Sequence, residues 1–338
     1  MAEVTVKSVQ AELVERAPLR VPYWEVTAGA AGPVLLVTAA QHGNEVQGSE
    51  ALRRFVQLAG QELQAGAVLG VPFCNLPALW QRRHHDTQGP EEPVAEQPER
   101  NMNLVWPGDP AGNDIARLAH AIYSELGTRA THAVDIHCWN RFWAAAGLPR
   151  RDQPLSVELA AVSALPFARP MDPPPPEAPR PTPTLIGGYF NDTDRVGFTF
   201  ELAGQYVIYE SEVQLGWRCL VNVARFLGMM PGEPEGTDEG PVWLDRAEAV
   251  EVTAPSSGLF VEAGLQPADW VSQGQLLGHL ISDRDLSAQP LLAPVAGRLS
   301  AYGSHRAHCD VSLPDMHPYA SVGDLLAKVV VPEQEPRS

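Results

Sequence analysis

The sequence predicts an α/β fold, with a mixed but mostly parallel sheet flanked by helices, followed by a small all-β domain. Short apolar runs alternate with amphipathic helical patterns over the first two thirds of the chain, which is typical of an α/β layer structure. An acidic stretch rich in proline and glycine then interrupts the chain at residues 230–241. Beyond it, short β segments separated by Gly and Pro turns replace the helical patterns.

The predicted strands of the first part are four apolar runs bounded by turn residues. These runs cover residues 34–40, 67–73, 131–136 and 197–202. They are continuously apolar, which indicates strands covered on both faces, as in a mostly parallel sheet. Apolar residues at helical spacing predict helices at 46–59, 115–126, 155–164 and 210–227.

Residues 169–184 contain a run of four prolines and four further X-Pro steps, which exclude a helix or a central strand. We therefore expect a long surface loop there. Long loops in compact domains often act as lids, and a permissive insertion is an equally good interpretation.

The acidic stretch divides the chain into a catalytic domain at 1–230 and a β-rich domain at 241–332. Short β segments are expected at 251–253, 258–261, 270–271, 276–281 and 297–302. The phrases at 271–278 and 292–297 resemble the hairpins of biotinyl and lipoyl carrier domains, which have a barrel-sandwich hybrid fold. Such a carrier needs a lysine at a hairpin tip, and Lys328 lies close to the chain end instead. A swinging-arm function is therefore not expected.

Composition and charge exclude several classes of protein. The 338 residues carry a net charge of −17, which repels nucleic acids and anionic membrane surfaces. There is no apolar run of ~18 residues and no signal-like N-terminus, so a cytoplasmic location is expected. The cysteines are dispersed without a CxxC pair, which suits reduced thiols: Cys74, Cys138, Cys219 and Cys309.

A metal site is predicted where the first buried strand ends. The apolar run at 35–40 stops at His42 and Glu45, and both side chains are zinc donors. A catalytic zinc takes three protein ligands, and ligands in open α/β sheets gather at the carboxyl ends of strands. His137 follows the run at 131–136 and is the expected third ligand. The sequence thus predicts one zinc ion per chain, held by two histidines and a glutamate.

With these residues in place, the sequence resembles the succinylglutamate desuccinylase/aspartoacylase family. Four motifs occur in the order of the family: His-Gly-Asn-Glu at 42–45, Asn-Met-Asn-Leu-Val-Trp-Pro-Gly at 101–108, Asp-Ile-His at 135–137 and Phe-Glu-Leu-Ala-Gly at 200–204. The resemblance spans about residues 30–330 and implies a zinc carboxypeptidase-like fold.

The resemblance also implies roles for individual residues. Glu201 corresponds to the general base, a task for which a carboxylate beside zinc-bound water is suited. In the family an arginine after an Asn-Pro-Ala-like turn stabilises the oxyanion, and here Arg82 and Arg83 follow the turn at 75–78. Arg82 is the favoured oxyanion donor and Arg83 a substrate-binding residue. Asp135 suits either a role in orienting a ligand or a structural role at the strand end.

One motif departs from the family. Asn103-Leu104 stands where the family usually has Asn-Arg, whose arginine clamps the free carboxylate of the substrate. Leucine cannot form that bidentate ion pair. Asn103 is retained as a substrate-binding residue. Either another arginine, such as Arg100 or Arg141, supplies the clamp, or the substrate lacks a carboxylate at that place.

These features favour a zinc amidohydrolase that cleaves the amide bond of a small N-acyl amino acid or N-acyl amine by a zinc-activated water. Two alternatives are a metallocarboxypeptidase acting on a peptide and a catalytically silent zinc-binding protein. The expected partner is a small-molecule substrate, without nucleic acid or membrane, and a homo-oligomer is compatible with the sequence.

Overall fold

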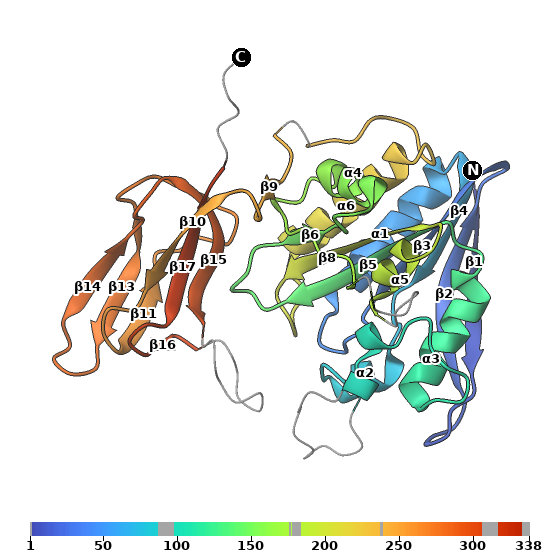
Figure 1. Ribbon diagram of the computed structural model, residues 1–338, viewed down its shortest axis with the longest axis horizontal. Helices are drawn as coiled ribbons and strands as arrows, with labels where there is room; N and C mark the ends of the chain where they lie inside the picture. The colour runs from blue at the N-terminus through green and yellow to red at the C-terminus, as the bar shows by residue number, and fades with distance from the viewer. Residues whose placement is uncertain are drawn as a thin grey trace.

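A nine-stranded sheet forms the framework of the first domain (Figure 1). The computed structural model describes residues 2–86, 98–175, 177, 184–236, 239–305 and 317–332. The strand order is β1-β2-β4-β3-β5-β8-β6-β7-β9. The strands are β1 (Glu3–Ala11), β2 (Leu19–Thr27), β3 (Ala30–Ala39), β4 (Ala65–Val71), β5 (His132–Trp139), β6 (Ala146–Leu148), β7 (Phe167–Ala168), β8 (Val196–Ala203) and β9 (Val242–Trp243).

The pairing of these strands confirms the predicted mixed, mostly parallel sheet. Five neighbouring pairs are parallel, including β3–β4, β3–β5 and β5–β8 at the centre. Three pairs are antiparallel. The four apolar runs of the sequence form β3, β4, β5 and β8. In β3, the apolar side chains of Leu35, Leu36, Val37 and Ala39 are fully buried in the core. Continuous burial of this kind follows from helices on both faces.

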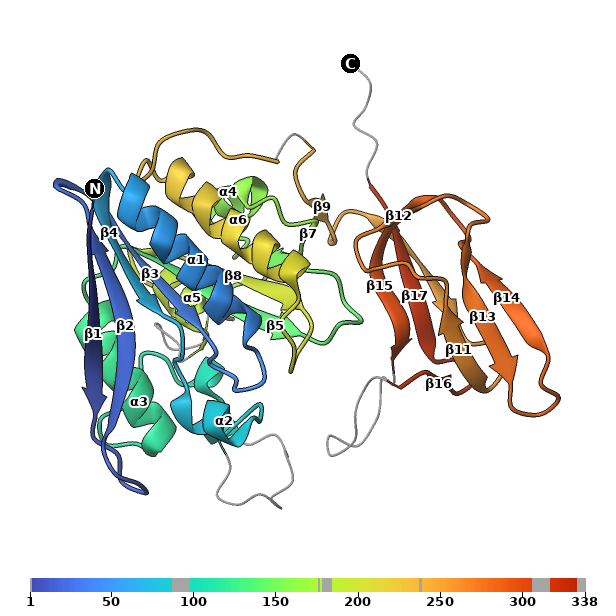
Figure 2. The ribbon, with the colours of Figure 1, turned by 180° about the vertical axis from the view of Figure 1, so that it is seen from behind.

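Helices cover both faces of the sheet, and α1 and α6 lie on the face seen in Figure 2. The helices are α1 (Gln47–Glu62), α2 (Leu76–Gln81), α3 (Asp114–Ile122), α4 (Pro154–Val162), α5 (Ile186–Asn191) and α6 (Glu210–Phe226). Helices α1, α4 and α6 pack into one core with β3, β5 and β8. Helices α3 and α5 pack into a second core on the opposite face. The helices expected at 46–59, 155–164 and 210–227 are α1, α4 and α6, whereas the pattern at 115–126 covers α3 and the π-helical turn Tyr123–Gly127 after it.

The C-terminal part is all-β, as predicted, and consists of two separate antiparallel sheets. One has the order β10-β17-β15-β12 and the other the order β14-β13-β11-β16. Their strands are β10 (Glu248–Thr253), β11 (Gly258–Glu262), β12 (Trp270–Val271), β13 (Leu276–Ser282), β14 (Ala288–Leu292), β15 (Gly297–His305), β16 (Tyr319–Ala320) and β17 (Leu325–Val331). Side chains of both sheets share one apolar core, which includes Phe260, Leu280, Leu299 and Val329.

The large sheet extends further along the chain than the sequence indicated. Val242 and Trp243 of β9 fall in the range 241–332 assigned to the second domain, yet they pair with β7 in the large sheet. The boundary therefore shifts from residue 241 to the segment between Trp243 and Glu248. The acidic, proline-rich composition marked the loop before β9, but a two-residue strand leaves no hydrophobic pattern of its own.

Backbone hydrogen bonds join the two domains directly. The amide of Ala144 donates to the carbonyl of Ser300 at 3.0 Å, and the amide of Tyr302 donates to the carbonyl of Phe142 at 2.9 Å. A small buried cluster of Ala144, Ala146, Phe167 and Val330 lies beside these bonds. The mutual position of the domains is thus set by both strand-like pairing and apolar burial.

Two further features of the described chain concern membrane-crossing helices and cysteines. No helix within the described ranges has both the length and the apolar character needed to cross a membrane. Cys74, Cys138 and Cys219 are buried free thiols. Cys309 and most of the distal half of the expected loop at 169–184 lie outside the described residues.

Candidate metal centre

The predicted donor residues lie where β3 and β5 end side by side. β3 ends at Ala39, and Ala40 then adopts a left-handed conformation with a φ of 51° before the turn that carries His42 and Glu45. A non-glycine residue in this conformation is uncommon and is held by its surroundings. The turn leads directly into α1, so His42 and Glu45 are placed by a strand on one side and a helix on the other.

Hydrogen bonds from the β4–α2 connection hold this turn in place. The amide of Asn75 donates to the carbonyl of Ala40 at 3.1 Å, and the Asn75 side chain donates to the carbonyl of Gln41 at 3.0 Å. Gly43 packs so closely on α2 that a Cβ atom would lie 2.2 Å from the carbonyl carbon and oxygen of Ala78. Only glycine fits at that position without displacing α2.

His42, Glu45 and His137 meet in the interior and form a set that could hold a metal ion, with donor atoms within 4.8 Å of one another. The Nδ1 atom of His42 lies 2.9 Å from Oε1 of Glu45. The Nδ1 atom of His137 lies 2.9 Å from Oε2 of the same carboxylate. All three residues are buried, and none is more than 4% exposed.

The protons on the two imidazole rings are determined by acceptors on their outer nitrogens. His42 Nε2 lies 3.1 Å from Oδ1 of Asn101, and that oxygen also accepts from the amide of Asn103. His137 Nε2 lies 3.0 Å from Oδ2 of Asp135. Both Nε2 atoms must therefore donate, which leaves the Nδ1 lone pairs facing the Glu45 oxygens. A positive charge must therefore lie between Nδ1 and the carboxylate, and either a proton on the ring or a bound metal cation supplies it.

The electrostatics of the cluster agree with this conclusion. Burial opposes ionisation of Glu45, but His42 and His137 lower its pKa well below the usual range. Burial also opposes protonation of His137, but Asp135 and Glu45 raise its pKa well above the usual range. The two buried carboxylates thus keep a positive charge on His137, and a bound cation would take the place of that proton.

Asp135 is itself fixed by its neighbours. Its Oδ1 atom accepts hydrogen bonds from the Thr38 hydroxyl at 2.7 Å and from Gln41 Nε2 at 2.5 Å. Gln41 in turn accepts from the indole N–H of Trp106 at 2.6 Å. Of the two roles left open for Asp135, the structure therefore supports the orientation of His137.

Glu201 stands beside the donor set on the next strand. β5 and β8 are parallel neighbours in which His137 pairs with Glu201, so the two side chains project from the same face of the sheet. Glu201 is only partly buried, unlike the three donors. Burial and the carboxylates of Glu45 and Asp135 raise the pKa of Glu201 to about 8, although His137 opposes this shift.

Two further histidines, His84 and His85, also adjoin the donor set. The ring of His84 stacks on that of His42 with centroids 3.7 Å apart, and its Nδ1 atom lies 3.1 Å from Oδ1 of Asn44. His85 is buried, and its Nδ1 atom has no hydrogen-bond partner among the described residues. Burial lowers the pKa of His84 to about 3 and that of His85 to about 4, so both rings are neutral at pH 7. His42, His84 and His85 form a second set with metal-binding spacing.

The arginines expected at the site differ in their exposure and contacts. Arg82 is exposed at the end of α2 and adopts a left-handed conformation there with a φ of 57°. No hydrogen bond within the described part of the chain joins its side chain to the donor set, and its expected role at the oxyanion stays a prediction. Arg83 is half-buried. Arg100 donates to the backbone carbonyl of Asp86 at 3.4 Å.

The loop that departs from the family motif shows one buried and one exposed side chain. Oδ1 of Asn103 is buried and lacks a hydrogen-bond partner in the described parts of the chain, which suits a residue that binds a ligand. Leu104 is 46% exposed. Arg141, the other proposed clamp, forms an ion pair of 3.2 Å with Glu262 of the second domain.

Several residues around the centre were not predicted from the sequence. Asn101 orients His42, while Gln205 donates to Oε1 of Glu45 at 3.3 Å and to the carbonyl of Cys138 at 2.7 Å. Asn101 opens the Asn-Met-Asn-Leu motif, and Gln205 follows the Phe-Glu-Leu-Ala-Gly motif. Their proximity to recognised motifs was the available signal, but neither residue type is itself a preferred metal ligand.

Comparison with known proteins was decisive for the family. The family model of the succinylglutamate desuccinylase/aspartoacylase catalytic domain matches residues 31–227, more than half of the chain. The chain belongs to this family.

The chain is also similar to a curated protein in sequence and to solved structures in fold. The chain is 26% identical over 257 residues to the N-alpha-acetyl-L-2,4-diaminobutyric acid deacetylase of Halomonas elongata, covering 74% of this chain and 70% of the relative. An aspartoacylase family protein from Mesorhizobium loti superposes with a TM-score of 0.67 at 19% identity, covering 99% and 96% of the two chains. The ectoine utilization protein EutE (DoeB) from Ruegeria pomeroyi, in its product-bound structure, superposes with a TM-score of 0.66 at 20% identity, covering 97% and 95%.

Proposed function

We propose that the protein is a zinc-dependent amidohydrolase that removes an acyl group from the nitrogen of a small N-acyl amino acid or N-acyl amine. The observation that carries the proposal is the donor set of His42, Glu45 and His137, with both outer imidazole nitrogens engaged by acceptors and Glu201 in register beside His137. The family name describes deacylating hydrolases, which cleave amides.

The choice of zinc follows from the chemistry of the donors. Two imidazole nitrogens and one carboxylate are the ligand set of several catalytic zinc sites, which keep a further coordination position open. Zinc bound by these residues would act as a Lewis acid and lower the pKa of a bound water toward ~7. Asn101 and Asp135 would hold the two imidazoles in the tautomer that binds a metal through Nδ1.

Glu201 would move the protons of the reaction. Its carboxylate would accept a proton from the water that attacks the amide carbon, and would pass it to the amine nitrogen as the C–N bond breaks. Its position beside His137 and its partial exposure allow it to reach both water and substrate. The buried Oδ1 of Asn103 offers an acceptor to an N–H group of the substrate.

The name of a relative supports the proposed substrate class. The Halomonas elongata deacetylase is named for an N-acetylated amino acid, which favours a small N-acyl amino acid here as well. With a net charge of −17, we continue to expect a small-molecule substrate and neither nucleic acid nor membrane as partner.

Replacement of the proposed base tests the mechanism. Glu201→Gln keeps the size of the side chain but cannot accept a proton, so we expect turnover of N-acyl amino acids to fall by about 10²- to 10⁴-fold. Zinc content, measured by plasma mass spectrometry, should remain one per chain. Glu210→Gln is the matched control, because Glu210 is exposed on α6 and pairs with Arg54 on the opposite face of the sheet.

Other outcomes would point to the alternatives. Full turnover by Glu201→Gln would contradict the proposed base. Hydrolysis of short peptides in preference to N-acyl amino acids would favour a metallocarboxypeptidase. A reconstituted protein that binds no zinc and cleaves neither class of compound would favour a catalytically silent member of the family.

A further inference from the structure

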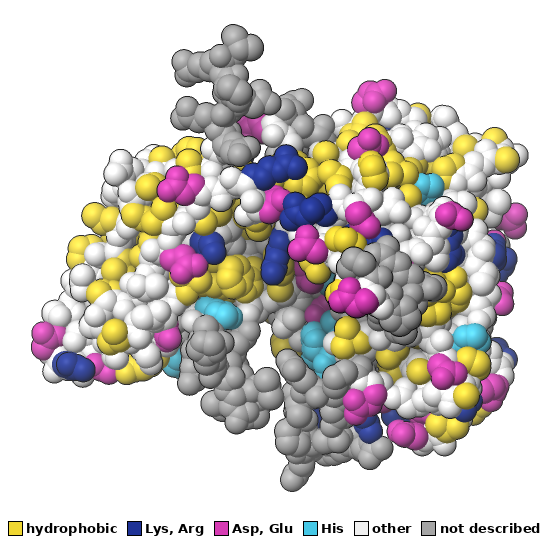
Figure 3. Space-filling model, viewed as in Figure 1, with side chains coloured by type: hydrophobic (Ala, Val, Ile, Leu, Met, Phe, Trp, Pro, Cys, Tyr) yellow, Lys and Arg dark blue, Asp and Glu magenta, His cyan; other side chains and the backbone are white. Residues whose placement is uncertain are grey.

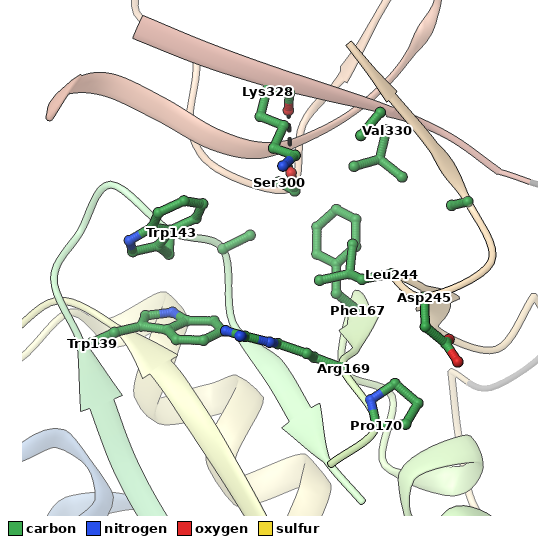
Figure 4. Close-up of a pocket in the computed structure, with 13 residues that line it drawn as sticks. Trp139, Trp143, Phe167, Arg169, Pro170, Leu244, Asp245, Ser300, Lys328 and Val330 are labelled. Carbon is green, nitrogen blue, oxygen red and sulfur yellow. Dashed lines mark hydrogen bonds between the residues drawn. The ribbon is translucent and has the colours of Figure 1, made fainter. Parts of the chain in front are cut away.

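A cavity of about 610 Å³ lies between the two domains (Figure 4). Its walls come from the catalytic domain, through Trp139, Trp143 and Phe167, and from the second domain, through Ser300 and Val330. Its size is that of a pocket for a small organic ligand. In Figure 3, Lys and Arg side chains gather together with hydrophobic ones where the two domains meet.

The register of the sheet connects this cavity to the proposed catalytic residues. His137 pairs with Glu201, Glu201 with Ala146, and Ala146 with Phe167, so one row of side chains crosses four strands on the same face. With strands about 4.8 Å apart, Phe167 lies about 10 Å from Glu201. Trp139 follows His137 by two residues on β5 and projects from the same face, about 7 Å along the strand. A ligand that extended about 10 Å from Glu201 along this face would reach the residues that line the cavity.

The walls of the cavity suit a large apolar group. The rings of Trp139 and Trp143 lie with their centroids 6.5 Å apart, and in Figure 4 they stand opposite Phe167, Leu244 and Val330. Aromatic rings and apolar side chains on facing walls favour an aromatic or broad aliphatic group packed against them.

The charges that line the cavity leave one cation without a partner in the described parts of the chain. Asp245 pairs with Arg151 at 2.6 Å, and Lys328 pairs with Glu251 at 3.1 Å. The side chain of Arg169 has no ion pair or hydrogen bond among the residues that the structure describes, and in Figure 4 it points toward the Trp139 indole. In a chain with a net charge of −17, such a guanidinium on an apolar cavity is suited to a carboxylate of the ligand.

A second donor lies on the same wall. The indole Nε1 of Trp139 is buried and has no hydrogen-bond partner within the described ranges. A buried donor of this kind costs free energy unless a ligand or water accepts from it. Together with Arg169, it offers two donors to one acceptor group next to an apolar wall.

We propose that this cavity binds the amino-acid half of the substrate, and that the substrate is an N-acylated aromatic amino acid whose carboxylate contacts Arg169 and Trp139. The proposal rests on the proposed amidohydrolase function and specifies its substrate. Arg169 would supply the positive charge that Leu104 cannot, from a different element of the fold.

The first test compares substrates with the zinc-loaded wild-type protein. We expect kcat/KM for N-acetyl-L-phenylalanine to exceed that for N-acetyl-L-alanine by about tenfold to a hundredfold, because the phenyl group is buried. N-acetyl-L-phenylalaninamide, which lacks the carboxylate, should be a poorer substrate than the acid. N-phenylacetyl-L-alanine, with its ring on the acyl side, should not share the advantage.

The second test changes the two donors. Arg169→Gln should lower kcat/KM for N-acetyl-L-phenylalanine by about tenfold to a hundredfold. It should leave kcat/KM for the amide unchanged. Trp139→Phe, which keeps an aromatic ring but removes the N–H, should lower kcat/KM for the acid by about two- to tenfold. Arg53→Gln is the matched control, because Arg53 is on α1, across the sheet, and pairs only with Glu50 among the described residues.

Binding separates this proposal from the proposed function. Tryptophan fluorescence can report binding of N-acetyl-L-phenylalanine and its amide even if no compound is hydrolysed. If the acid binds more tightly than the amide and Arg169→Gln abolishes this difference, the proposed role of the cavity is supported even though the hydrolase proposal fails. Equal kcat/KM for the phenylalanine and alanine compounds, a preference for N-phenylacetyl-L-alanine, or an unchanged ratio of acid to amide in Arg169→Gln would each overturn the proposal.

Discussion

At the scale of single residues, the candidate centre depends on where protons reside on two histidines. His42 and His137 both donate from Nε2, to Asn101 and Asp135 respectively, so both present Nδ1 to Glu45. This placement costs little in the folded protein because each acceptor is held by other donors. In water, by contrast, either tautomer of a neutral histidine is free to form.

Asp135→Asn tests this arrangement directly. Thr38 and Gln41 both donate to one oxygen of Asp135, so the asparagine amide NH₂ would have to face His137 Nε2. Two donors would then oppose each other, and His137 would move its proton to Nδ1 and lose the lone pair that binds metal. We expect zinc affinity, measured by chelator competition, to fall by about 10- to 100-fold.

The control for this change is Asp194→Asn, which neutralises an exposed aspartate of the same domain. It should leave zinc affinity as in the wild type. Unaltered zinc affinity in Asp135→Asn would show that Asp135 serves the strand end and does not orient His137.

At the scale of secondary-structure elements, the N-terminal hairpin is attached to the sheet by a buried carboxylate. Glu25 of β2 pairs with Lys7 of β1 at 2.7 Å and also with Arg129, which precedes β5. Burial opposes ionisation of Glu25, but Arg129 and Lys7 outweigh it and lower its pKa. One side chain thus links the consecutive strands β1 and β2 to the segment before β5, 104 residues further along the chain.

Glu25→Gln should therefore reduce stability in a pH-dependent way. Because the pKa is lower in the folded than in the unfolded protein, the ionised carboxylate stabilises the fold above the unfolded value of ~4.3. This contribution is lost as the pH falls through the lower folded pKa. We expect the variant to lose about 1 kcal/mol of unfolding free energy at pH 7 and to approach the wild type in acid.

Urea unfolding at a series of pH values measures this difference. Glu3→Gln, an exposed change on β1, serves as control and should have no such effect. A deficit of Glu25→Gln that is as large at pH 3 as at pH 7 would contradict the electrostatic explanation.

The elements differ in how far the sequence predicted them. The buried strands β3, β4, β5 and β8 were predicted because a short, continuously apolar run between turn residues is typical of a strand covered on both faces. The hairpin β1–β2 was missed. Val4 and Val6 alternate with polar residues, but both valines are exposed, at 46% and 70%, so this alternation does not mark a buried face. β6, β7 and β9 have three residues or fewer, too few to show a period.

At the scale of the whole molecule, the second domain completes a wall of the cavity between the two domains. Val330 of β17 is 1% exposed and packs with Ala144, Ala146 and Phe167 of the catalytic domain, whereas its neighbour Val329 packs in the core of the second domain. Alternate residues of one strand therefore serve two different cores, as expected from the period of a β-strand.

Val330→Asp should separate the domains without unfolding either. Burying a carboxylate there without a partner would cost about 3 kcal/mol or more of free energy. Moving the domains apart would expose the carboxylate to water and remove this cost. We expect a larger radius of gyration by small-angle X-ray scattering with zinc content unchanged.

Val322→Asp, at a position that is 64% exposed, is the control and should keep the compact arrangement. An unchanged radius of gyration in a folded Val330→Asp protein would show that the backbone hydrogen bonds at 142–144 suffice to hold the domains together.

The sequence by itself determined the class of fold, the family and the three candidate metal donors. It could do so because buried parallel strands are continuously apolar, and a histidine or glutamate that ends such a run stands out. What only the tertiary structure decided was the surroundings of those donors: that Asn101 orients His42 across 59 residues, that His84 and His85 adjoin the centre, and that a cavity opens between the domains. These facts depend on side chains brought together from distant segments, and no local pattern of the sequence encodes such contacts.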